Sequence, residues 1–357
     1  MLNYLSAVWL IIKNQNQKTL AVENLLASFF ILSLQTATME NNNKNFYFDV
    51  ARQVWGMKDI FVNIYMIQNE DEKSWVLVDT GLKTSARKIK RMAASLFGEN
   101  SKPKCIVLTH GHFDHVGSLK KLADEWDVPV YAHYLELPYL TGRSAYPPPD
   151  PSVGGGLMAW MSFIYPSKPI NMQNKVYALP EDGTIPSLKG WRYIHTPGHA
   201  PGHISLFRDE DKTLIAGDAF VTTDQQSAIA VMYQTKKLQG PPTYFTYDWD
   251  AANESVKKLM ILAPEVAATG HGRPMYGAEM RNQLHNLHTN FEKAAVPSHG
   301  RYVDEPAVTD ANGLLYVPPK EETKNFVPWA VAGVALGFAA IMVLKKQKRK
   351  KAFHLGF

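Results

Sequence analysis

The sequence has almost no cysteine and, apart from its last residues, no concentration of charge of one sign. Cys105 is the single cysteine among 357 residues, so the chain cannot form an internal disulfide. It stands in an apolar stretch, which is typical of an inert thiol in a protein core. The formal net charge of +5 comes largely from a basic run at 345–351. The rest of the chain is close to neutral, so we expect no nucleic-acid partner.

Hydrophobic residues make up 45% of the chain, which is ample for a folded core. A chain of this length holds one large domain or two small ones. Strand-like and helix-like segments alternate between residues 46 and 297, which predicts sheets flanked by helices. We expect strands at 46–54, 61–68, 75–79, 105–109, 128–131, 175–179, 191–196, 203–208, 214–216 and 266–269, and helices at 85–97, 117–126, 249–263 and 275–295.

The densest group of potential metal ligands lies on the loop between one of these strands and the next helix. His110, His112, Asp114 and His115 fall within six residues. The carboxyl end of a strand is where α/β folds place ligand sites. The first two histidines can face one ion, and the last two side chains can face a second. Imidazole with carboxylate suits zinc, iron or manganese. Solvated histidines beside a helix-capping Asp114 are the alternative, but this density of ligands favours a metal site.

Further motifs follow in the order of a known family. Val78-Asp79-Thr80-Gly81 precedes the histidine-rich loop. After the loop come Thr196-Pro197-Gly198-His199-Ala200-Pro201-Gly202-His203, then Ala216-Gly217-Asp218, then Gly270-His271-Gly272. Together with His110-x-His112-x-Asp114-His115, the series resembles the metallo-β-lactamase fold superfamily, which includes glyoxalase II-like thioesterases, lactonases and nucleases. The resemblance covers roughly residues 46–295. It implies a mixed α/β (α+β) fold, a four-layer αββα sandwich with metals at one edge of the packed sheets.

The resemblance also implies a dinuclear metal centre. It assigns His110, His112 and His199 to the first ion. It assigns Asp114, His115 and His271 to the second ion, and Asp218 as a carboxylate that bridges both ions. Residue spacing alone does not distinguish His199 from His195 and His203. The family pattern selects His199 and leaves His203, like Asp79, to support the ligands without touching metal. Zinc is the expected ion, with iron or manganese as alternatives.

Two ions held close together would lower the pKa of a shared water and present it as hydroxide to a carbonyl or phosphoryl centre. Asp114 is the ligand best placed to accept the proton of this nucleophile. No Ser or Cys nucleophile is required. The sequence therefore predicts a metal-dependent hydrolase that cleaves an ester, thioester or lactone in a small-molecule substrate.

Other branches of the superfamily fit less well. Asp218 stands where class B β-lactamases usually carry cysteine, and His112 argues against the flavodiiron oxidoreductases. Ala219-Phe220-Val221 offers no clear match to the tyrosine of the homoserine-lactone lactonases. A membrane anchor is expected where glyoxalase II enzymes carry a glutathione-binding domain. The alternatives left open are a phosphodiester hydrolase, a mononuclear iron persulfide dioxygenase, and a non-catalytic membrane-tethered metal-binding module.

Two segments interrupt the alternation of strands and helices. Residues 134–175 combine prolines and glycines with an apolar cluster at 157–161. Because long loops inside compact domains are often functional, we expect a partly helical substrate lid, with a plain packing insertion as the alternative. A second lid-like stretch, 225–246, carries several aromatic residues.

The two ends of the chain differ from the domain between them. Residues 1–45 are either a signal peptide or an extension before a true start at Met39. Residues 298–324 are polar and contain proline, so a linker is expected there. Residues 325–344 lack charge and are long enough to span a bilayer as a single transmembrane helix. The basic tail, 345–357, is expected on the cytosolic side. Lipid is therefore an expected partner, and the side of the membrane that carries the catalytic domain depends on an export signal.

Overall fold

The structure is a computed structural model that describes residues 46–320 except 71–72, 155, 173, 225–229 and 231–234. The chain divides into two units at residue 318, and the helices and strands described belong to the first. Within the described ranges, no helix has the length and apolar character that a membrane crossing requires. The expected N-terminal extension, transmembrane helix and basic tail, 1–45, 325–344 and 345–357, lie outside the described residues.

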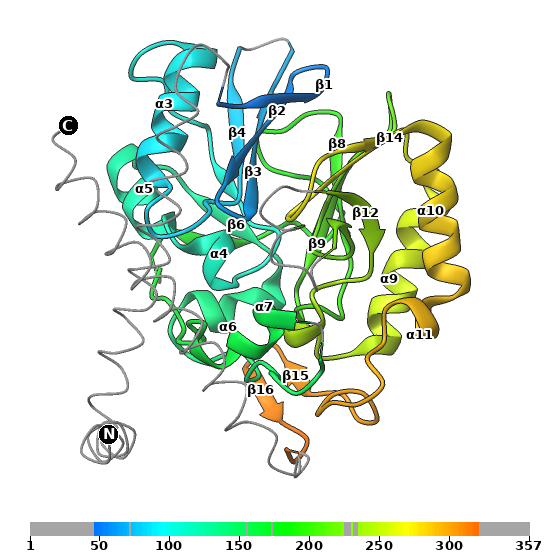
Figure 1. The fold of residues 1–357 in the computed structure, drawn as a ribbon. Coiled ribbons are helices and arrows are strands. Elements are labelled where there is room, and N and C mark those ends of the chain that lie inside the picture. Colours follow the sequence, from blue (N-terminus) through cyan, green and yellow to red (C-terminus); the bar gives the residue numbers. More distant parts are fainter. Residues whose placement is uncertain are drawn as a thin grey trace, which may run out of the picture. The chain divides into compact units, whose positions relative to one another are not determined.

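The first half of the unit forms a seven-stranded mixed sheet whose strands follow chain order (Figure 1). Strands β1 to β4 pair antiparallel, and β4 to β7 pair parallel. Val76 and Val78 face the second sheet, whereas Trp75 and Leu77 face helices, as the two-residue period of a strand requires. The strands are β1 (Phe48–Ala51), β2 (Val54–Asp59), β3 (Val62–Gln68), β4 (Trp75–Val78), β5 (Ile106–Val107), β6 (Val130–Ala132) and β7 (Val176–Ala178).

The second half forms a five-stranded sheet in the order β14-β13-β10-β9-β8. Ile215 packs between the two sheets, and its neighbours Leu214 and Ala216 pack on the opposite face against helices. Cys105 also lies in the core between the sheets, where burial raises the pKa of its thiol to about 12, as expected for an inert cysteine. The strands are β8 (Trp191–His195), β9 (Ile204–Arg208), β10 (Thr213–Gly217), β13 (Val266–Thr269) and β14 (Met275–Tyr276); beside them β11 (Val221–Thr223) pairs with β12 (Lys236–Gln239).

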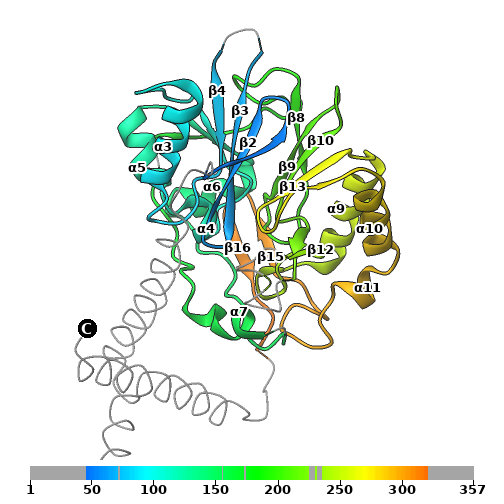
Figure 2. The ribbon, with the colours of Figure 1, turned by 45° about the horizontal axis from the view of Figure 1, so that its top comes forward.

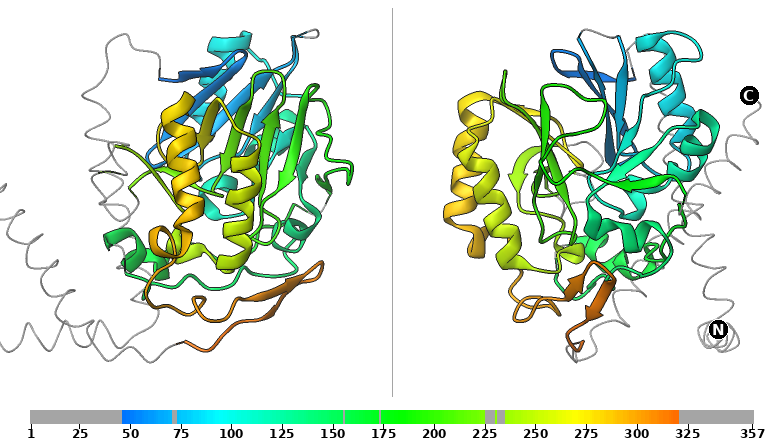
Figure 3. Two further views of the ribbon diagram at one scale, coloured as in Figure 1. Left: turned by 90° about the vertical axis from the view of Figure 1, so that its right-hand side faces the viewer. Right: turned by 180° about the vertical axis from the view of Figure 1, so that it is seen from behind.

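Two pairs of helices cover the outer faces of the sheets. Helices α3 (Ala86–Phe97) and α5 (Leu119–Trp126) pack on the seven-stranded sheet. Helices α9 (Trp249–Ile261) and α10 (Gly277–Thr289) pack on the five-stranded sheet, where the yellow and yellow-green helices of Figure 3 lie across the strands. The four layers are visible side by side in Figure 2. This confirms the predicted mixed α/β fold with its αββα layers.

The insertion at 134–175 is partly helical, as expected, and short helices also occur at the histidine-rich loop and near the end of the domain. These elements are α4 (Phe113–Val116), η1 (Tyr134–Glu136), α6 (Leu137–Leu140), α7 (Gly156–Trp160), η2 (Met161–Ile164), η3 (Thr243–Phe245) and α11 (Phe291–Ala294).

Some element boundaries differ from those expected. The strand expected at 46–54 is shorter, because β1 ends at Ala51 before a tight turn in which Gln53 has a left-handed φ of 58°. The strand that follows this turn, β2, was not expected as a strand beyond Val54. Met275 and Tyr276 of the helix expected at 275–295 form β14 instead, and α10 begins at Gly277, whose φ of 65° separates strand from helix. The helix then breaks at Asn290, between α10 and α11.

The stretch expected to be a linker, 298–324, is folded in the part that the structure describes. It contains a hairpin of β15 (Val308–Asp310) and β16 (Gly313–Tyr316). Tyr302 is buried, and its hydroxyl donates to the carbonyl of Pro148 at 2.6 Å. Proline and polar residues suggested an open segment, but an aromatic side chain with a partner on the insertion holds this stretch against the domain.

Candidate metal centre

Five of the seven predicted ligands lie on loops next to strands of both sheets, and the other two, Asp114 and His115, lie in the short helix α4. His110 and His112 follow β5, Asp218 follows β10, and His271 follows β13. His199 lies on the connection from β8 to β9. Because β10 and β13 are parallel, their carboxyl ends meet at the same edge of the sheet. Five distant sequence motifs are thereby brought to one place.

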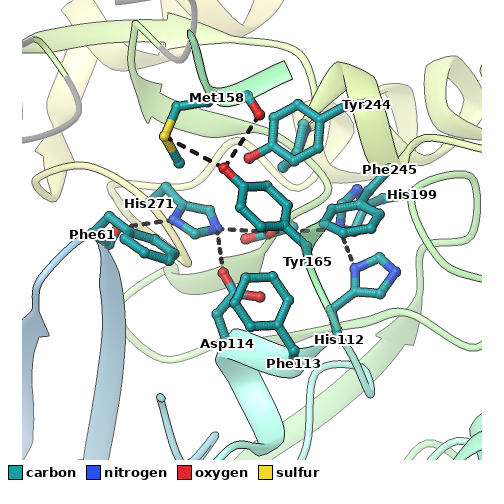
Figure 4. Close-up of a pocket in the computed structure, with 12 residues that line it drawn as sticks. Phe61, His112, Phe113, Asp114, Met158, Tyr165, His199, Tyr244, Phe245 and His271 are labelled. Carbon is teal, nitrogen blue, oxygen red and sulfur yellow. Dashed lines mark hydrogen bonds and ion pairs between the residues drawn. The ribbon is translucent and has the colours of Figure 1, made fainter. Parts of the chain in front are cut away.

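All seven predicted ligands are buried, and their side chains converge. They form three overlapping groups in which the ligand atoms lie within 4.8 Å of one another: His110, His112 and His199; His110, His115 and Asp218; and Asp114, His115 and His271. Nδ1 of His112 is 2.9 Å from Nε2 of His199. Figure 4 shows His112, Asp114, His199 and His271 around the floor of a pocket. The first and third groups match the two ligand sets implied by the family resemblance.

Asp218 lies between these two groups. Its Oδ2 is 3.1 Å from Nε2 of His271 and 3.5 Å from Nε2 of His199. The same oxygen is 3.5 Å from Nε2 of His115. Gly270 leaves the space for this carboxylate, since a Cβ at that position would overlap Asp218 Oδ1. The Gly-His-Gly motif therefore provides room for the aspartate as well as a ligand.

The donor set fits divalent metal ions. Within the described part of the chain, Nε2 of His110 and Oδ1 of Asp218 are buried and have no hydrogen-bond partner. Buried polar atoms of proteins are normally hydrogen-bonded, so such atoms indicate ligand positions. Histidine nitrogens and carboxylate oxygens are the donors that zinc, iron and manganese accept.

Burial and neighbouring charges set the protonation of the ligands. Burial lowers the pKa of His110 and His199 well below the ordinary value and lowers that of His112 to about 3, so the first group is neutral, as metal binding requires. Burial would also lower the pKa values of His115 and His271, but the nearby carboxylates, led by Asp218, raise both. These carboxylates therefore favour the protonated, positively charged forms of His115 and His271.

Asp79 and His203 contact the ligand-bearing segments, as expected of supporting residues. Oδ2 of Asp79 is 2.8 Å from Nδ1 of His115, and Oδ1 accepts the Thr109 N–H at 2.8 Å. Nε2 of His203 accepts the N–H of Asp218 at 2.8 Å. Neither residue belongs to a group of the described residues that could hold a metal. Their contacts orient one ligand ring and fix the backbone of the shared carboxylate.

Sequence reasoning missed Glu136, a fully buried residue at the end of η1. Its carboxylate accepts the N–H of Gly111 at 2.8 Å and the N–H of Gly202 at 2.7 Å. The hydroxyl of Tyr146 also donates to it. One glycine lies between His110 and His112, and the other immediately precedes His203. Burial raises the pKa of Glu136 to about 7 although its three donors act in the opposite direction. A lone carboxylate in the apolar run 134–140 was the available signal.

A pocket opens above the metal ligands, and both lid-like segments contribute to it. Met158 and Tyr165 come from the insertion, and Pro242, Tyr244 and Phe245 come from the second lid-like stretch. These positions support the interpretation of both segments as walls of a substrate site. The described lining consists of Phe61, His112, Phe113, Asp114, Met158, Tyr165, His199, Asp218, Pro242, Tyr244, Phe245 and His271.

His195, the histidine that spacing alone did not distinguish from His199, lies away from the ligand groups. Its ring stacks on His133 with centroids 4.0 Å apart, and its Nε2 is 2.9 Å from the carbonyl oxygen of Pro201. Burial, with a contribution from His195, lowers the pKa of His133 from 6.5 to about 3. Buried His133, which directly follows β6, and half-buried His195 at the end of β8 therefore form a neutral contact between the two sheets.

We expect His133→Asn to reduce the acid sensitivity of the fold. In the unfolded chain His133 takes up a proton as the pH falls through 6.5, whereas in the folded chain it stays neutral down to about 3. The unfolded state then binds more protons, so this residue lowers the free energy of unfolding as the pH falls from 6.5 to 3. Denaturant unfolding of chelator-treated protein across this range measures the difference. Parallel pH profiles for variant and wild type would contradict the assignment.

Comparisons with known proteins assign the chain to a family. The family described as the metallo-beta-lactamase superfamily matches residues 57–271. The probable metallo-hydrolase YflN of Bacillus subtilis (strain 168) is 47% identical over 241 residues, which cover 67% of this chain and 91% of that protein. Hydroxyacylglutathione hydrolase GloC of Haemophilus influenzae is 28% identical over 153 residues, 42% of this chain and 62% of that protein. The crystal structure of TTHA1623 in a di-iron-bound form has 27% identity and a TM-score of 0.41, and the match covers 62% of this chain and 92% of that one. The chain belongs to the metallo-β-lactamase superfamily and is a metallohydrolase.

Proposed function

We propose that the protein hydrolyses an ester, thioester or lactone with two divalent metal ions held in the buried centre. The observation that carries the proposal is the position of Asp218 Oδ2, which lies within 3.5 Å of His199 in the first ligand group and of His271 in the third. A carboxylate oxygen between two ligand groups is suited to bridge two ions. The residues that would hold the ions are His110, His112 and His199; Asp114, His115 and His271; and Asp218 for both.

In the proposed reaction a water oxygen bonds to the carbonyl carbon, and the bond from that carbon to the alcohol or thiol breaks. When bound, divalent ions lower the pKa of water towards neutrality and polarise the carbonyl oxygen. The residues of the chain position these groups. Asp79 contacts His115, His203 accepts the Asp218 N–H, and aromatic side chains line the pocket where the substrate would lie.

Asp114 is assigned the role of proton acceptor. It lines the pocket, and its Oδ2 is 3.5 Å from Nε2 of His271. Burial raises the pKa of Asp114, although His115 and His271 act in the opposite direction. A carboxylate with a raised pKa is a better general base near neutral pH. The carboxylate would take the proton of the attacking water and return it to the leaving group.

Metal analysis of protein purified without added metal is expected to approach two ions per chain. Zinc is the expected ion, with iron or manganese as alternatives. A panel of ester, thioester, lactone and phosphodiester substrates then tests the reaction, and turnover of a carbonyl substrate is expected. A firm content of one ion that zinc does not raise would contradict the dinuclear centre. Exclusive phosphodiester cleavage, or oxygen uptake that depends on a persulfide, would overturn the proposed reaction.

Membrane attachment through residues 325–344 is a separate proposal that rests on the sequence alone. The full chain is expected to sediment with membranes and to resist salt and carbonate washing, because a charge-free segment of this length suits the bilayer core. A chain that ends at Thr323 is expected to be soluble and active. Recovery of the full chain in the soluble fraction without detergent would contradict attachment. Protease treatment of spheroplasts would report the side that carries the catalytic domain.

A further inference from the structure

Five aromatic side chains surround the opening above the metal ligands. We call this set, Phe61, Phe113, Tyr165, Tyr244 and Phe245, the aromatic rim (Figure 4). Neighbouring rings are in contact range around it. Phe113 lies 5.2 Å from Tyr165 and 6.5 Å from Phe61 between ring centroids. Tyr165 lies 5.8 Å from Tyr244 and 6.0 Å from Phe245.

The rim is assembled from separate parts of the chain and is joined directly to the ligands. Phe61 comes from the turn between β2 and β3, and its ring stacks on His271 at 6.0 Å. Phe245 stacks on His112 at 4.6 Å. Phe113 stands inside the ligand motif itself, between His112 and Asp114. Any part of a substrate that extends from the metal ligands out through the pocket would therefore contact the faces of these aromatic rings.

The charge of the lining restricts what those faces can hold. Among the described residues that line the pocket, none is Lys or Arg, and the carboxylates are Asp114 and Asp218 of the ligand set. The Tyr165 hydroxyl already donates to the carbonyl of Met158 at 3.2 Å. A carboxylate or phosphate on the distal part of a substrate would lose water against the rim without gaining a cationic partner.

We propose that the aromatic rim selects substrates whose non-reacting part is uncharged and apolar, such as an aryl or short acyl group, and rejects those that carry a distal anion. The inference rests on the proposed function, because that function supplies the carbonyl group that reacts at the metal ligands. The selection between neutral and charged groups occurs when the substrate binds and can be measured without turnover. Aromatic faces favour flat or aliphatic groups through contact area and through stacking.

The test compares two esters that differ in one charge. They are 4-nitrophenyl butyrate and the same ester with a carboxylate on the ring. For the metal-loaded wild type, kcat/KM is expected to be at least about tenfold higher for the neutral ester. Equal values, or a preference for the carboxylated ester, would overturn the proposal.

Variants at Met158 separate charge from shape. Met158 lines the pocket from α7 without being a ligand or a member of the rim, so Met158→Arg adds a cation and preserves the aromatic rings. It is expected to reduce the preference for the neutral ester to about threefold or less. Met158→Gln, which is similar in length and neutral, should keep the wild-type preference. Phe163→Arg should keep it as well, because Phe163 is 59% exposed on the same insertion and is not among the lining residues. An unchanged preference in Met158→Arg would contradict the proposal.

The binding of two amide analogues that are not hydrolysed separates the rim proposal from the proposed function. 4′-Nitrobutyranilide and its ring-carboxylated analogue have nearly the shapes of the two esters, and calorimetry measures their affinity for the metal-loaded protein. If no carbonyl substrate is turned over but the neutral anilide binds more tightly, the proposed function fails and the selective rim stands. If esters are hydrolysed but both anilides bind equally, the rim proposal fails and the proposed function stands.

Discussion

Replacement of Asp218 by alanine is expected to lower kcat/KM at least about 100-fold while it leaves the fold intact, since loss of even a supporting residue of a metal centre costs up to about that factor. The carboxylate lies within 3.5 Å of histidine nitrogens from both outer ligand groups, so no other described residue can take its place between them. Its removal should also release at least one ion, which metal analysis after gel filtration would measure.

The backbone at this position does not depend on the side chain. The Asp218 N–H donates to His203 Nε2, and that hydrogen bond remains in the alanine variant. Circular dichroism of the two proteins should therefore agree. His195→Asn is a useful control, because His195 immediately precedes the motif that carries His199 but belongs to none of the ligand groups. It should keep the metal content of the wild type. An Asp218→Ala variant with wild-type turnover and two ions would show that Asp218 is not the bridge.

The sequence was sufficient for the parts of the site whose signal is local. Ligand motifs consist of a few adjacent residues with fixed spacing, such as His110 and His112, and each follows an apolar strand that can be read directly. The alternation of strands and helices was readable in the same way, whereas the αββα layers were expected only from the family resemblance. The residues of β4, Trp75–Val78, are all apolar and all buried, so the sequence alone does not show which of them face the helices and which face the second sheet.

What the sequence did not reveal depends on contacts between distant segments. Phe61 and Phe245 are far apart in the sequence, and they line one pocket only because the fold brings their two loops together. The hairpin at 308–316 packs through Leu314, whose N–H donates to Ser144 at 3.0 Å, and no local pattern predicts that partner. Polar composition therefore suggested a linker where tertiary contacts hold a folded segment. Glu136 was missed for the same reason, because its three donors come from three separate segments.

Replacement of Glu136 by glutamine is expected to lower the free energy of unfolding by about 1–3 kcal/mol and to speed the loss of metal to a chelator. Both carboxylate oxygens are used: Oε1 accepts from Gly202, and Oε2 accepts from Gly111 and Tyr146. A glutamine amide has one acceptor oxygen and one donor nitrogen. In either orientation its NH₂ group faces a buried N–H, which leaves donors unsatisfied. The loops that carry His110, His112 and His199 then lose a shared anchor.

Tyr146→Phe provides the matched comparison, because it removes one donor and leaves both glycine N–H groups bonded to the carboxylate. Its ring can still stack on Tyr139 at 4.0 Å and pack beside His112 at 4.6 Å. The loss of stability and the rate of metal release should therefore be smaller in Tyr146→Phe than in Glu136→Gln. Denaturant unfolding and chelator competition on both variants give the two measurements. A Glu136→Gln variant that keeps its metal as well as the wild type, or a larger effect in Tyr146→Phe, would contradict the role of the carboxylate. The larger effect is expected in Glu136→Gln because of the number of donors. The buried carboxylate can lose the Tyr146 hydroxyl and still accept the N–H groups of both ligand-bearing loops, whereas an amide in the same place cannot accept both.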